Sequence, residues 1–516
     1  MGFLDEITGQ EGLTLLSSLF IFVIGVVVLV VILLFIRDVS QTKDAIRHNY
    51  PVIGRFRYLF SNLGEFFRQY FFAMDREEMP FNRAEREWVY KSAEGRDNTV
   101  AFGSTKNINP PGTALFINCP FPTLDEHASS APALCIGPCC EQPYHASSLI
   151  NISGMSYGAL SKPAVRALSM GARLAGCWMN TGEGGLAPYH LEGGCDIVFQ
   201  IGTAKYGVRK ADGSLDDEKL KAIAAHSQVK MFEVKMSQGA KPGKGGILPG
   251  VKVTDEIARI RGIEVGMDSI SPNRHPEISN IKELLSFVGH VRDVTGKPTG
   301  FKTVIGAYDW LIEMCEEIQR CGIECAPDFI TIDSCDGGTG AAPMPLMDDV
   351  GLTIKEALPM VVDILIRYGL RERIRVIASG KLITPSGVAW ALCAGADFIT
   401  SARGFMFALG CIQALKCNKN TCPTGITTHN KHLQQGLDPE EKAVRVKHFV
   451  DKIHYGAGLI AHSCGVPHPR GLSRYHCRIV QSDGKSLLLD ELYPLPEVLP
   501  EFRPKSTNAD YNKEMS

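Results

Sequence analysis

The sequence predicts an α/β fold of the (βα)8 TIM-type barrel class, preceded by an N-terminal transmembrane helix. Nine short apolar runs each end in Gly, Ser, Thr, Asn or another polar residue and are followed by helical patterns. The runs occupy residues 149–153, 177–180, 196–200, 231–236, 268–271, 299–304, 328–333, 375–379 and 397–401. Strands that alternate with helices form parallel βα units, and eight such units close into a barrel, so one run is expected to lie outside it. A doubly wound open sheet is the alternative, but no GxGxxG motif follows the first strand.

The transmembrane helix is expected over residues 13–36, which contain no charged residue. A helix of this length spans about 36 Å, more than the roughly 30 Å of a hydrocarbon core. A secretory signal peptide is the alternative, but its apolar region is shorter and follows basic residues. Here acidic residues precede the span and basic residues from Arg37 onward follow it. The positive-inside rule therefore predicts a single-pass membrane protein with residues 1–12 outside and the large body in the cytoplasm.

The charge distribution argues against nucleic-acid binding, and the expected cytoplasmic location argues against a disulfide framework. The formal net charge is −2 and the basic residues are dispersed, which argues against nucleic-acid binding. In a reducing cytoplasm the 16 cysteines are not expected to form a disulfide framework, and Cys139 and Cys140 are expected to be plain thiols.

Between the membrane span and the barrel, residues 57–75 are patterned as an amphipathic helix. Its aromatic face either packs on the body, the simpler interpretation, or lies on the membrane surface.

Glycine-rich motifs follow six of the predicted strands. They are SGMSYG (153–158), NTGEGG (180–185), KMSQGAKPGKGG (235–246), DSCDGGTGAAP (333–343), ASGK (378–381) and SARG (401–404). Barrel enzymes keep their chemistry at this carboxyl face, and glycine loops let backbone N–H groups approach a phosphate. The last two βα loops are the usual phosphate site, with Lys381 or Arg403 adding charge. Together the motifs predict one large phosphorylated ligand.

Three cysteines, Cys411, Cys417 and Cys422, lie in the segment GCIQALKCNKNTCPTG. In a helix, steps of six and five residues rotate by about 600° and 500°, which scatters the thiols around the axis. Pro423 and Gly425 favour a wrapped loop instead. A zinc site usually has four ligands with a CxxC pair, whereas iron–sulfur clusters are held by Cys thiolates. Spacing alone leaves open an iron–sulfur site or unrelated buried thiols.

These motifs, in this order over residues 148–457, resemble the FMN-binding synthase domain of glutamate synthases. The membrane span and PFNRAEREWVY (80–90) are similar to a shorter branch, the FMN-binding glutamate synthase family. The resemblance implies a barrel that holds FMN beside a [3Fe–4S] cluster on Cys411, Cys417 and Cys422. It also implies an oxidoreductase acting on CH–NH2 donors, which reductively aminates 2-oxoglutarate to glutamate with external electrons.

The resemblance also implies roles for individual residues. Gly154, Met155 and Ser156 are expected against the flavin, and Gln200, Lys302, Gly337, Gly338 and Thr339 along its isoalloxazine ring. Gly380, Lys381, Arg403 and Gly404 are expected to hold the phosphate. Glu183, Gln238, Lys241 and Arg261 are expected to form the 2-oxoglutarate pocket, with Glu183 as a proton shuttle. For Lys241 and Arg261, a solvated surface cation is the alternative.

The chain also departs from the large glutamate synthases. It begins MGFLDEITG, without the N-terminal cysteine of an amidotransferase domain, so ammonia is expected from outside. Electrons are expected from a ferredoxin or an NAD(P)H reductase partner. Ile247 stands where the family commonly has a polar residue, and GMDSISPNRHPEIS (266–279) differs at Asn273 and Arg274. A membrane-attached electron-transfer protein with another substrate is therefore the alternative function, and a 2-hydroxy-acid oxidase fits less well.

The expected organisation has five parts. An extracytoplasmic N-terminus (1–12) and the transmembrane helix (13–36) are followed by a connecting region (37–147), the barrel with its cluster loop (148–457, loop 411–422) and a C-terminal extension (458–516).

Overall fold

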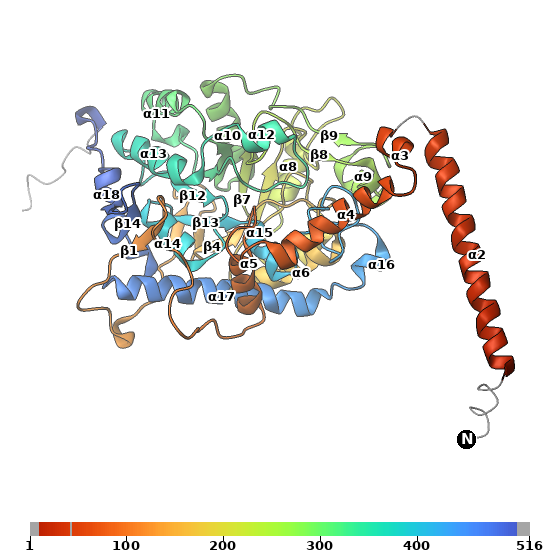
Figure 1. Ribbon diagram of the computed structural model, residues 1–516. Coiled ribbons are helices and arrows are strands. Elements are labelled where there is room, and N and C mark those ends of the chain that lie inside the picture. Colours follow the sequence, from red (N-terminus) through yellow and green to blue (C-terminus); the bar gives the residue numbers. More distant parts are fainter. Residues whose placement is uncertain (1–9, 42–43, 503–516) are drawn as a thin grey trace, which may run out of the picture. The chain divides into compact units, whose positions relative to one another are not determined.

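Two units make up the chain in the computed structural model, which describes residues 10–41 and 44–502 (Figure 1). The first unit is Met1–Ala84 and the second is Glu85–Ser516. The expected N-terminal segment 1–12 lies almost wholly outside the described residues, as does the end of the expected C-terminal extension. Each unit is described by itself.

The second unit is built around a closed barrel of eight parallel strands, which confirms the predicted fold class (Figure 1). In barrel order the strands are β4 (Ile150–Ile152), β5 (Met179–Asn180), β6 (Ile197–Ile201), β7 (Val229–Lys235), β10 (Thr299–Val304), β11 (Phe329–Asp333), β12 (Arg375–Ser379) and β13 (Phe398–Ser401). Pairing of β13 with β4, with Ile399 opposite Ile150, completes the ring. Nearly every residue of these strands is buried, as expected for parallel strands covered on both faces.

The ninth predicted strand, residues 268–271, lies outside the barrel. It forms β9 (Ser269–Ile270), which pairs antiparallel with β8 (Ile247–Leu248). Ile247, noted as a departure from the family pattern, pairs with Ile270 in this small sheet. A run of four residues with alternating serines cannot supply the continuous apolar surface of a barrel strand, which explains the difference.

Helices follow the strands and surround the barrel (Figure 1). The longer ones are α6 (Lys162–Ala175), α8 (Asp217–Ala224), α10 (Ile281–Thr295), α11 (Asp309–Cys321), α13 (Ile354–Arg367), α14 (Pro385–Cys393) and α17 (Pro439–Ser463). Another helix, α5 (Arg83–Ala93), precedes the barrel strands, and the shorter ones are α7 (Pro188–Glu192), α9 (Asp255–Arg261), α12 (Met344–Asp348), α15 (Arg403–Ala408), α16 (Lys431–Gln434) and α18 (Leu489–Leu492). Local sequence sets their ends: the Ser161 hydroxyl caps α6, and Gly176, in the left-handed region, terminates it.

A hairpin closes the amino-terminal end of the barrel. Its strands β2 (Leu134–Ile136) and β3 (Tyr144–Ala146) pair antiparallel. Ile136 and Tyr144 join a buried apolar cluster with residues at the starts of the barrel strands, including Trp178, Phe329 and Phe398. A further antiparallel sheet consists of β1 (Ala114–Phe116), β14 (Cys477–Val480) and β15 (Ser486–Leu488). With its amino end filled by side chains, the barrel presents its polar residues at the carboxyl end.

The first unit contains a long apolar helix, α2 (Gln10–Ser40), followed by α3 (Ala45–Asn49), α4 (Gly54–Phe67) and a π-helical turn, Arg68–Phe72. Among the described residues, one helix, Thr14–Ser40, is both long enough and apolar enough to cross a membrane. The mean hydropathy of its most apolar part is 3.7. The amphipathic helix predicted over 57–75 is present but begins three residues earlier, at Gly54, and ends in the π-helical turn.

Candidate active site

The predicted ligand-binding motifs all lie where barrel strands end. Gly154, Met155 and Ser156 follow β4, Glu183 follows β5, and Gln200 lies at the end of β6. Most of the remaining predicted residues follow the other strands: Gln238 and Lys241 follow β7; Gly337, Gly338 and Thr339 follow β11; Gly380 and Lys381 follow β12; and Arg403 and Gly404 follow β13. Lys302 lies within β10, and Arg261 ends α9. Because the strands are parallel, these loops meet at one face of the barrel.

A buried carboxylate, Glu233 on β7, organises the floor of this face. It accepts hydrogen bonds from Asn180 Nδ2 at 2.8 Å, Gln200 Nε2 at 2.6 Å and Thr331 Oγ1 at 2.6 Å. Gly154 lies directly against this network, since a Cβ there would be 2.8 Å from Gln200 Nε2. Only glycine fits between the network and the space in front of it.

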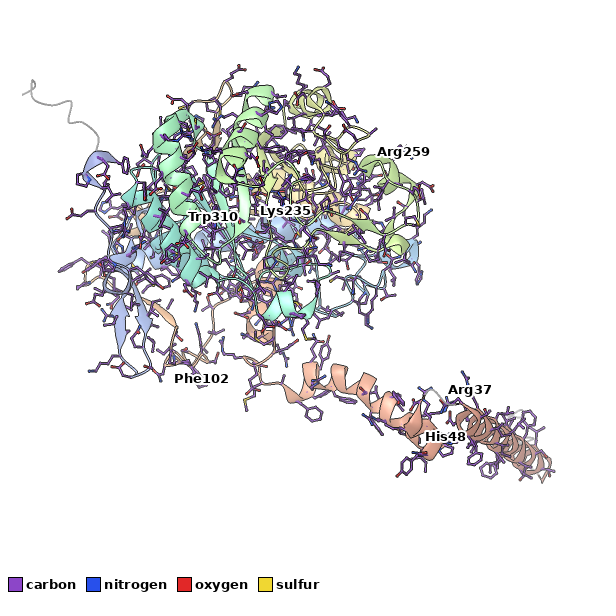
Figure 2. The ribbon with its side chains drawn as sticks, turned by 90° about the horizontal axis from the view of Figure 1, so that it is seen from above. Arg37, His48, Phe102, Lys235, Arg259 and Trp310 are labelled. Atoms are coloured by element: carbon purple, nitrogen blue, oxygen red, sulfur yellow. The ribbon has the colours of Figure 1, made fainter. Side chains whose placement is uncertain are left out.

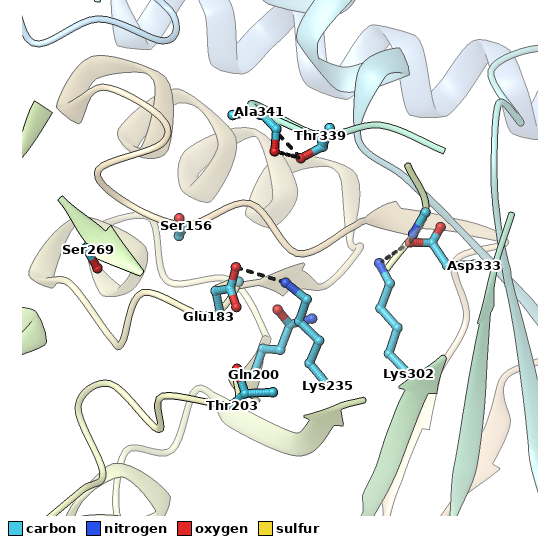
Figure 3. Close-up of polar contacts among 12 residues, drawn as sticks. Ser156, Glu183, Gln200, Thr203, Lys235, Ser269, Lys302, Asp333, Thr339 and Ala341 are labelled. Carbon is cyan, nitrogen blue, oxygen red and sulfur yellow. Dashed lines mark hydrogen bonds and ion pairs between the residues drawn. The ribbon is translucent and has the colours of Figure 1, made fainter. Parts of the chain in front are cut away.

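Two lysines on neighbouring strands point into the carboxyl end of the barrel, each toward its own carboxylate. Lys235 on β7 and Lys302 on β10 are register partners. Lys302 Nζ is 3.0 Å from Asp333 Oδ2, and Lys235 Nζ is 2.9 Å from Glu183 Oε1 (Figure 3). Burial opposes the charge on Lys302, but Asp333 and Glu233 outweigh it and raise the pKa of this lysine. Lys302 therefore remains a cation inside the barrel.

Glu183 is a buried carboxylate surrounded by cations. Burial raises its pKa, but the charges of Lys235, Lys241 and Arg261 outweigh burial, and the net pKa is lowered. A Cβ on Gly246 would lie 2.2 Å from Glu183 Oε1, so the loop after β7 also fixes this side chain. Glu183 is consequently ionised at neutral pH and is set up to accept a proton rather than donate one.

Lys241 and Arg261 are both buried, which contradicts the alternative that they are solvated surface cations. Burial, with the like charge of Lys235, lowers the pKa of Lys241 to about 8. Arg261 ends α9 and donates to Ser156 Oγ and to the Tyr157 carbonyl, each at 3.2 Å. Its Nε is buried with no hydrogen-bond partner among the described residues. Both side chains therefore belong to the interior of the site.

Gln238, the fourth residue of the predicted substrate pocket, is half-buried on the same loop as Lys241. Thr339 lies further along the face, where its hydroxyl exchanges hydrogen bonds with the backbone of Ala341 at 3.2 and 3.4 Å (Figure 3). Gln238 and Lys241, two of the four predicted pocket residues, therefore both lie between β7 and α9.

The predicted phosphate-binding residues gather around a carboxylate that the sequence analysis did not single out, Asp336. Lys381 Nζ is 2.8 Å from Asp336 Oδ2, and Arg403 donates to the Asp336 carbonyl at 3.3 Å. Gly338 lies against Arg403, with a Cβ position 3.0 Å from Arg403 Nε. Gly380, at φ +142°, packs on Ser334, whose hydroxyl donates to Asp336. Gly380, Lys381 and Arg403 thus meet around Asp336, which offsets part of the positive charge, whereas Gly404 packs against Ser401, Phe449 and Ile383.

The three-cysteine segment is a loop, as the rotation argument predicted. After α15 ends at Ala408, residues 411–430 contain no helix or strand. Burial raises the pKa of the Cys411 thiol to about 12, with smaller contributions from Cys417 and Cys422. Over residues 10–41 and 44–502, however, no group of three or more His, Cys, Asp or Glu side chains is close enough to hold a metal ion. The cluster ligands remain a prediction.

Two residues outside the loop help to hold it. Lys252 is buried and donates to the Ala159 carbonyl at 2.7 Å and to the Cys417 carbonyl at 3.4 Å. Tyr90 on α5 donates to the Cys411 carbonyl at 2.6 Å. The loop is therefore tied both to the first βα loop of the barrel and to the helix that precedes the barrel.

Comparison with known proteins gives the family. The family model described as "Conserved region in glutamate synthase" matches residues 123–466, about two thirds of the chain. The chain belongs to the glutamate synthase family. A Bacillus subtilis (strain 168) relative, "Glutamate synthase large subunit-like protein YerD", is 40% identical over 521 residues, covering 93% of this chain and 98% of the relative.

Other glutamate synthase relatives match over only part of their length. "Archaeal-type glutamate synthase [NADPH]" of Thermotoga neapolitana is 34% identical, and the match covers 60% of each chain. "Archaeal glutamate synthase [NADPH]" of Methanocaldococcus jannaschii is 36% identical over 58% of this chain and 56% of its own length. The chain thus spans somewhat more than half of these relatives. As a member of the family it is a flavin-dependent, glutamate synthase-like oxidoreductase, and the predicted family and enzyme class are confirmed.

Several site residues were missed by the sequence analysis: Glu233, Lys235, Asp333, Asp336 and Lys252. The signal for the first three was present, because each is a charged residue inside or at the end of an otherwise apolar strand. A charge in a strand that is buried on both faces needs a partner, which marks it as part of a polar site. No comparable signal marks Lys252, whose neighbours come from distant parts of the chain.

Proposed function

We propose that the chain reductively aminates 2-oxoglutarate to glutamate, using FMN in the barrel, electrons from an external donor and ammonia from outside. The observation that carries this proposal is the charge group at the carboxyl face. Lys235, Lys241 and Arg261 surround a single carboxylate, Glu183, and leave a surplus of positive charge. A dicarboxylate such as 2-oxoglutarate would neutralise that surplus, and the free buried Nε–H of Arg261 offers it a hydrogen bond.

FMN fits the residues at this face. Because Gly154 has no side chain, the backbone can lie directly against the Gln200–Glu233 network; a Cβ at this position would collide with Gln200. Lys302, kept charged by Asp333, would stabilise negative charge on a flavin ring, and Gln200 and the Gly337–Thr339 loop would line it. Arg403, Gly380, Lys381 and Gly404 would hold the phosphate, with Met155 and Ser156 at the first loop. When bound, FMN supplies the two electrons, as a hydride, for the reduction.

The chain's own residues would provide binding and proton transfer. The overall reaction joins 2-oxoglutarate and ammonium with two electrons and two protons, and it releases glutamate and water. Lys241 and Arg261 would hold the substrate carboxylates, with Gln238 beside them. Ionised Glu183 would take a proton from ammonium so that the amine can attack the keto carbon, and would return a proton to the departing hydroxyl. The lowered pKa keeps Glu183 ionised at neutral pH, so that the carboxylate is free to accept a proton.

We also propose that Cys411, Cys417 and Cys422 hold a [3Fe–4S] cluster. Support comes from their common loop and from the buried Lys252, which donates to the Cys417 carbonyl and lies near Cys417 and Cys422. Thiolate ligands are stabilised by a nearby positive charge. The cluster would pass electrons from a ferredoxin or a reductase partner toward the barrel.

The apolar helix α2 supports a single-pass membrane location with the barrel in the cytoplasm. Its 27-residue span is long enough to cross a bilayer, and Arg37 follows the most apolar part. This attachment also favours the second candidate function, in which the barrel passes electrons between the membrane and a soluble partner and acts on another substrate.

Anaerobic reoxidation tests the two candidates. The purified protein is reduced, mixed with 2-oxoglutarate and ammonium, and followed by flavin absorbance. Glutamate formation predicts faster reoxidation than with either reagent alone, and one glutamate per two electrons. Lys241→Met should abolish the acceleration, whereas Lys244→Met, on the exposed part of the same loop, should not. Reoxidation at the rate seen in buffer would rule out the 2-oxoglutarate reaction and leave the electron-transfer candidate.

A further inference from the structure

The helix α4, which follows α2 and the short α3, has an aromatic face that the proposed reaction does not use. On α4 (Gly54–Phe67) the side chains of Phe56, Leu59, Phe60 and Leu63 are 51%, 49%, 65% and 38% exposed. At about 100° per residue, these positions fall within an arc of roughly 100° on one side of the helix. Phe71 and Phe72, in the π-helical turn that follows, are also exposed, at 67% and 75%. Exposed aromatic side chains in such a continuous stripe indicate an interaction surface.

The opposite side of α4 is more polar, and one of its residues contacts another helix of the same unit. Tyr58 is half-buried and lies under the Arg47 guanidinium, 4.5 Å from the ring centroid. Ser61, also on this side, is polar and exposed. Over residues 37–72 there are six Lys or Arg residues and three Asp or Glu residues. An apolar face combined with a basic surplus is the composition of helices that lie in the headgroup region of anionic membranes.

A buried carboxylate fixes where α4 starts relative to α2. Asp38, in the last turns of α2, is 1% exposed. It accepts from Arg55 Nε at 2.8 Å, Arg55 Nη2 at 2.6 Å and the Val52 backbone N–H at 3.0 Å. These contacts hold the first turn of α4 against the end of α2. Arg37, in the last turn of α2, and His48, on α3, lie near this junction (Figure 2). If α2 crosses the bilayer, α4 therefore begins at the level of the headgroups.

We infer that α4 is an interfacial membrane helix whose Phe56, Leu59, Phe60 and Leu63 face inserts among the upper acyl chains. The inference rests on the membrane attachment by α2 proposed above. Interfacial helices bury their apolar face about 5–10 Å into the headgroup and acyl boundary, while basic side chains remain among the headgroups. The bidentate Arg55–Asp38 contact fixes the start of α4 against the end of α2 within the first unit.

Tryptophan fluorescence of the full-length protein in vesicles tests this inference. The vesicles contain phosphatidylcholine and phosphatidylglycerol, with bromine either near the top or near the end of the acyl chains. Phe60→Trp places the reporter on the apolar face of α4, Ser61→Trp places it on the opposite side as a matched control, and Val27→Trp places it in the middle of α2. The signal of the four native tryptophans is subtracted with the parent protein.

The expected result is a blue-shifted Phe60→Trp emission that shallow bromines quench more than deep ones, no such quenching for Ser61→Trp, and quenching of Val27→Trp by deep bromines. Quenching of Val27→Trp without quenching of Phe60→Trp would overturn the α4 inference and leave the α2 anchor standing. A blue-shifted but unquenched Phe60→Trp would show that protein, from this chain or a second copy, covers the face. Absence of quenching for both reporters would overturn the anchor as well.

Discussion

Lys241 has a pKa near neutrality because it is buried beside another lysine. Its charge, with a pKa of about 8, is present below that pH and is lost as the pH rises through it. If this charge holds a substrate carboxylate, kcat/KM for 2-oxoglutarate falls about tenfold per pH unit above pH 8. A pH profile of glutamate formation checks this. Lys241→Arg should move the descending limb to higher pH, and Lys244→Met should leave it in place; a limb that persists in Lys241→Arg contradicts the assignment.

Gly246 is expected to be as important as the charged residues, because it makes room for Glu183. The Cβ of an alanine there would be 2.2 Å from Glu183 Oε1 and would displace the carboxylate. A misplacement of about 1 Å costs on the order of 100-fold in rate, so Gly246→Ala should lower kcat by about that factor while flavin binding persists. Gly306→Ala, at the end of β10 with no atom within 4 Å of the new Cβ, is the control and should be near wild type. Equal activity of the two variants would contradict the packing argument.

At the scale of elements, the loop that was expected for the three cysteines is the loop that the structure contains. Helical rotation excluded convergence in a helix, and the chain indeed leaves the helix at Ala408. The loop is held by contacts from Lys252 and from Tyr90 on α5 rather than by regular structure.

Cys417→Ser should remove the iron–sulfur signal, because a serine hydroxyl at neutral pH is a poor iron ligand. Iron content should fall and the electron paramagnetic resonance signal of the oxidised cluster should disappear, while flavin content is retained. Cys321→Ser, at an exposed thiol that ends α11, should keep the full iron content. An unchanged signal in Cys417→Ser would exclude this cysteine as a ligand.

At the scale of the whole molecule, buried neutral histidines predict how the fold responds to acid. Burial lowers the pKa of His190, His275 and His454 from 6.5 to about 4. Between these values the unfolded chain binds protons that the folded protein cannot, so stability falls as the pH drops below 6.5. Each histidine contributes on the order of 3 kcal/mol to this loss, a large share of the 5–15 kcal/mol of a typical domain.

The melting temperature is therefore expected to fall steeply from pH 6.5 to pH 5, above the range where most carboxylates titrate. His454→Gln should flatten this slope, since the glutamine can accept the Leu149 N–H without titrating. His432→Gln, at an exposed histidine, should not. A melting temperature that is constant between pH 7 and pH 5 would contradict the prediction.

Periodicity alone was enough to predict the barrel, since eight of the nine apolar runs are barrel strands. The ninth forms β9 (Ser269–Ile270) outside the barrel, and its alternating serines, which interrupt the apolar surface that a buried parallel strand needs, were the local sign of this. The glycine motifs placed the site at the strand ends for a local reason: a turn that leaves a parallel strand needs small residues at its carboxyl end.

The sequence by itself determined the apolar span, the barrel strands, the loop character of the cysteine segment and the family. These depend on the order of neighbouring residues, which is local. Only the tertiary structure decided which charges meet. Glu183 and Lys235 are separated in the chain, as are Asp38 and Arg55, yet each two residues form an ion pair. Barrel closure and the α2–α4 junction bring them together, and the cations then keep both carboxylates ionised, because a carboxylate away from water stays ionised only beside a cation.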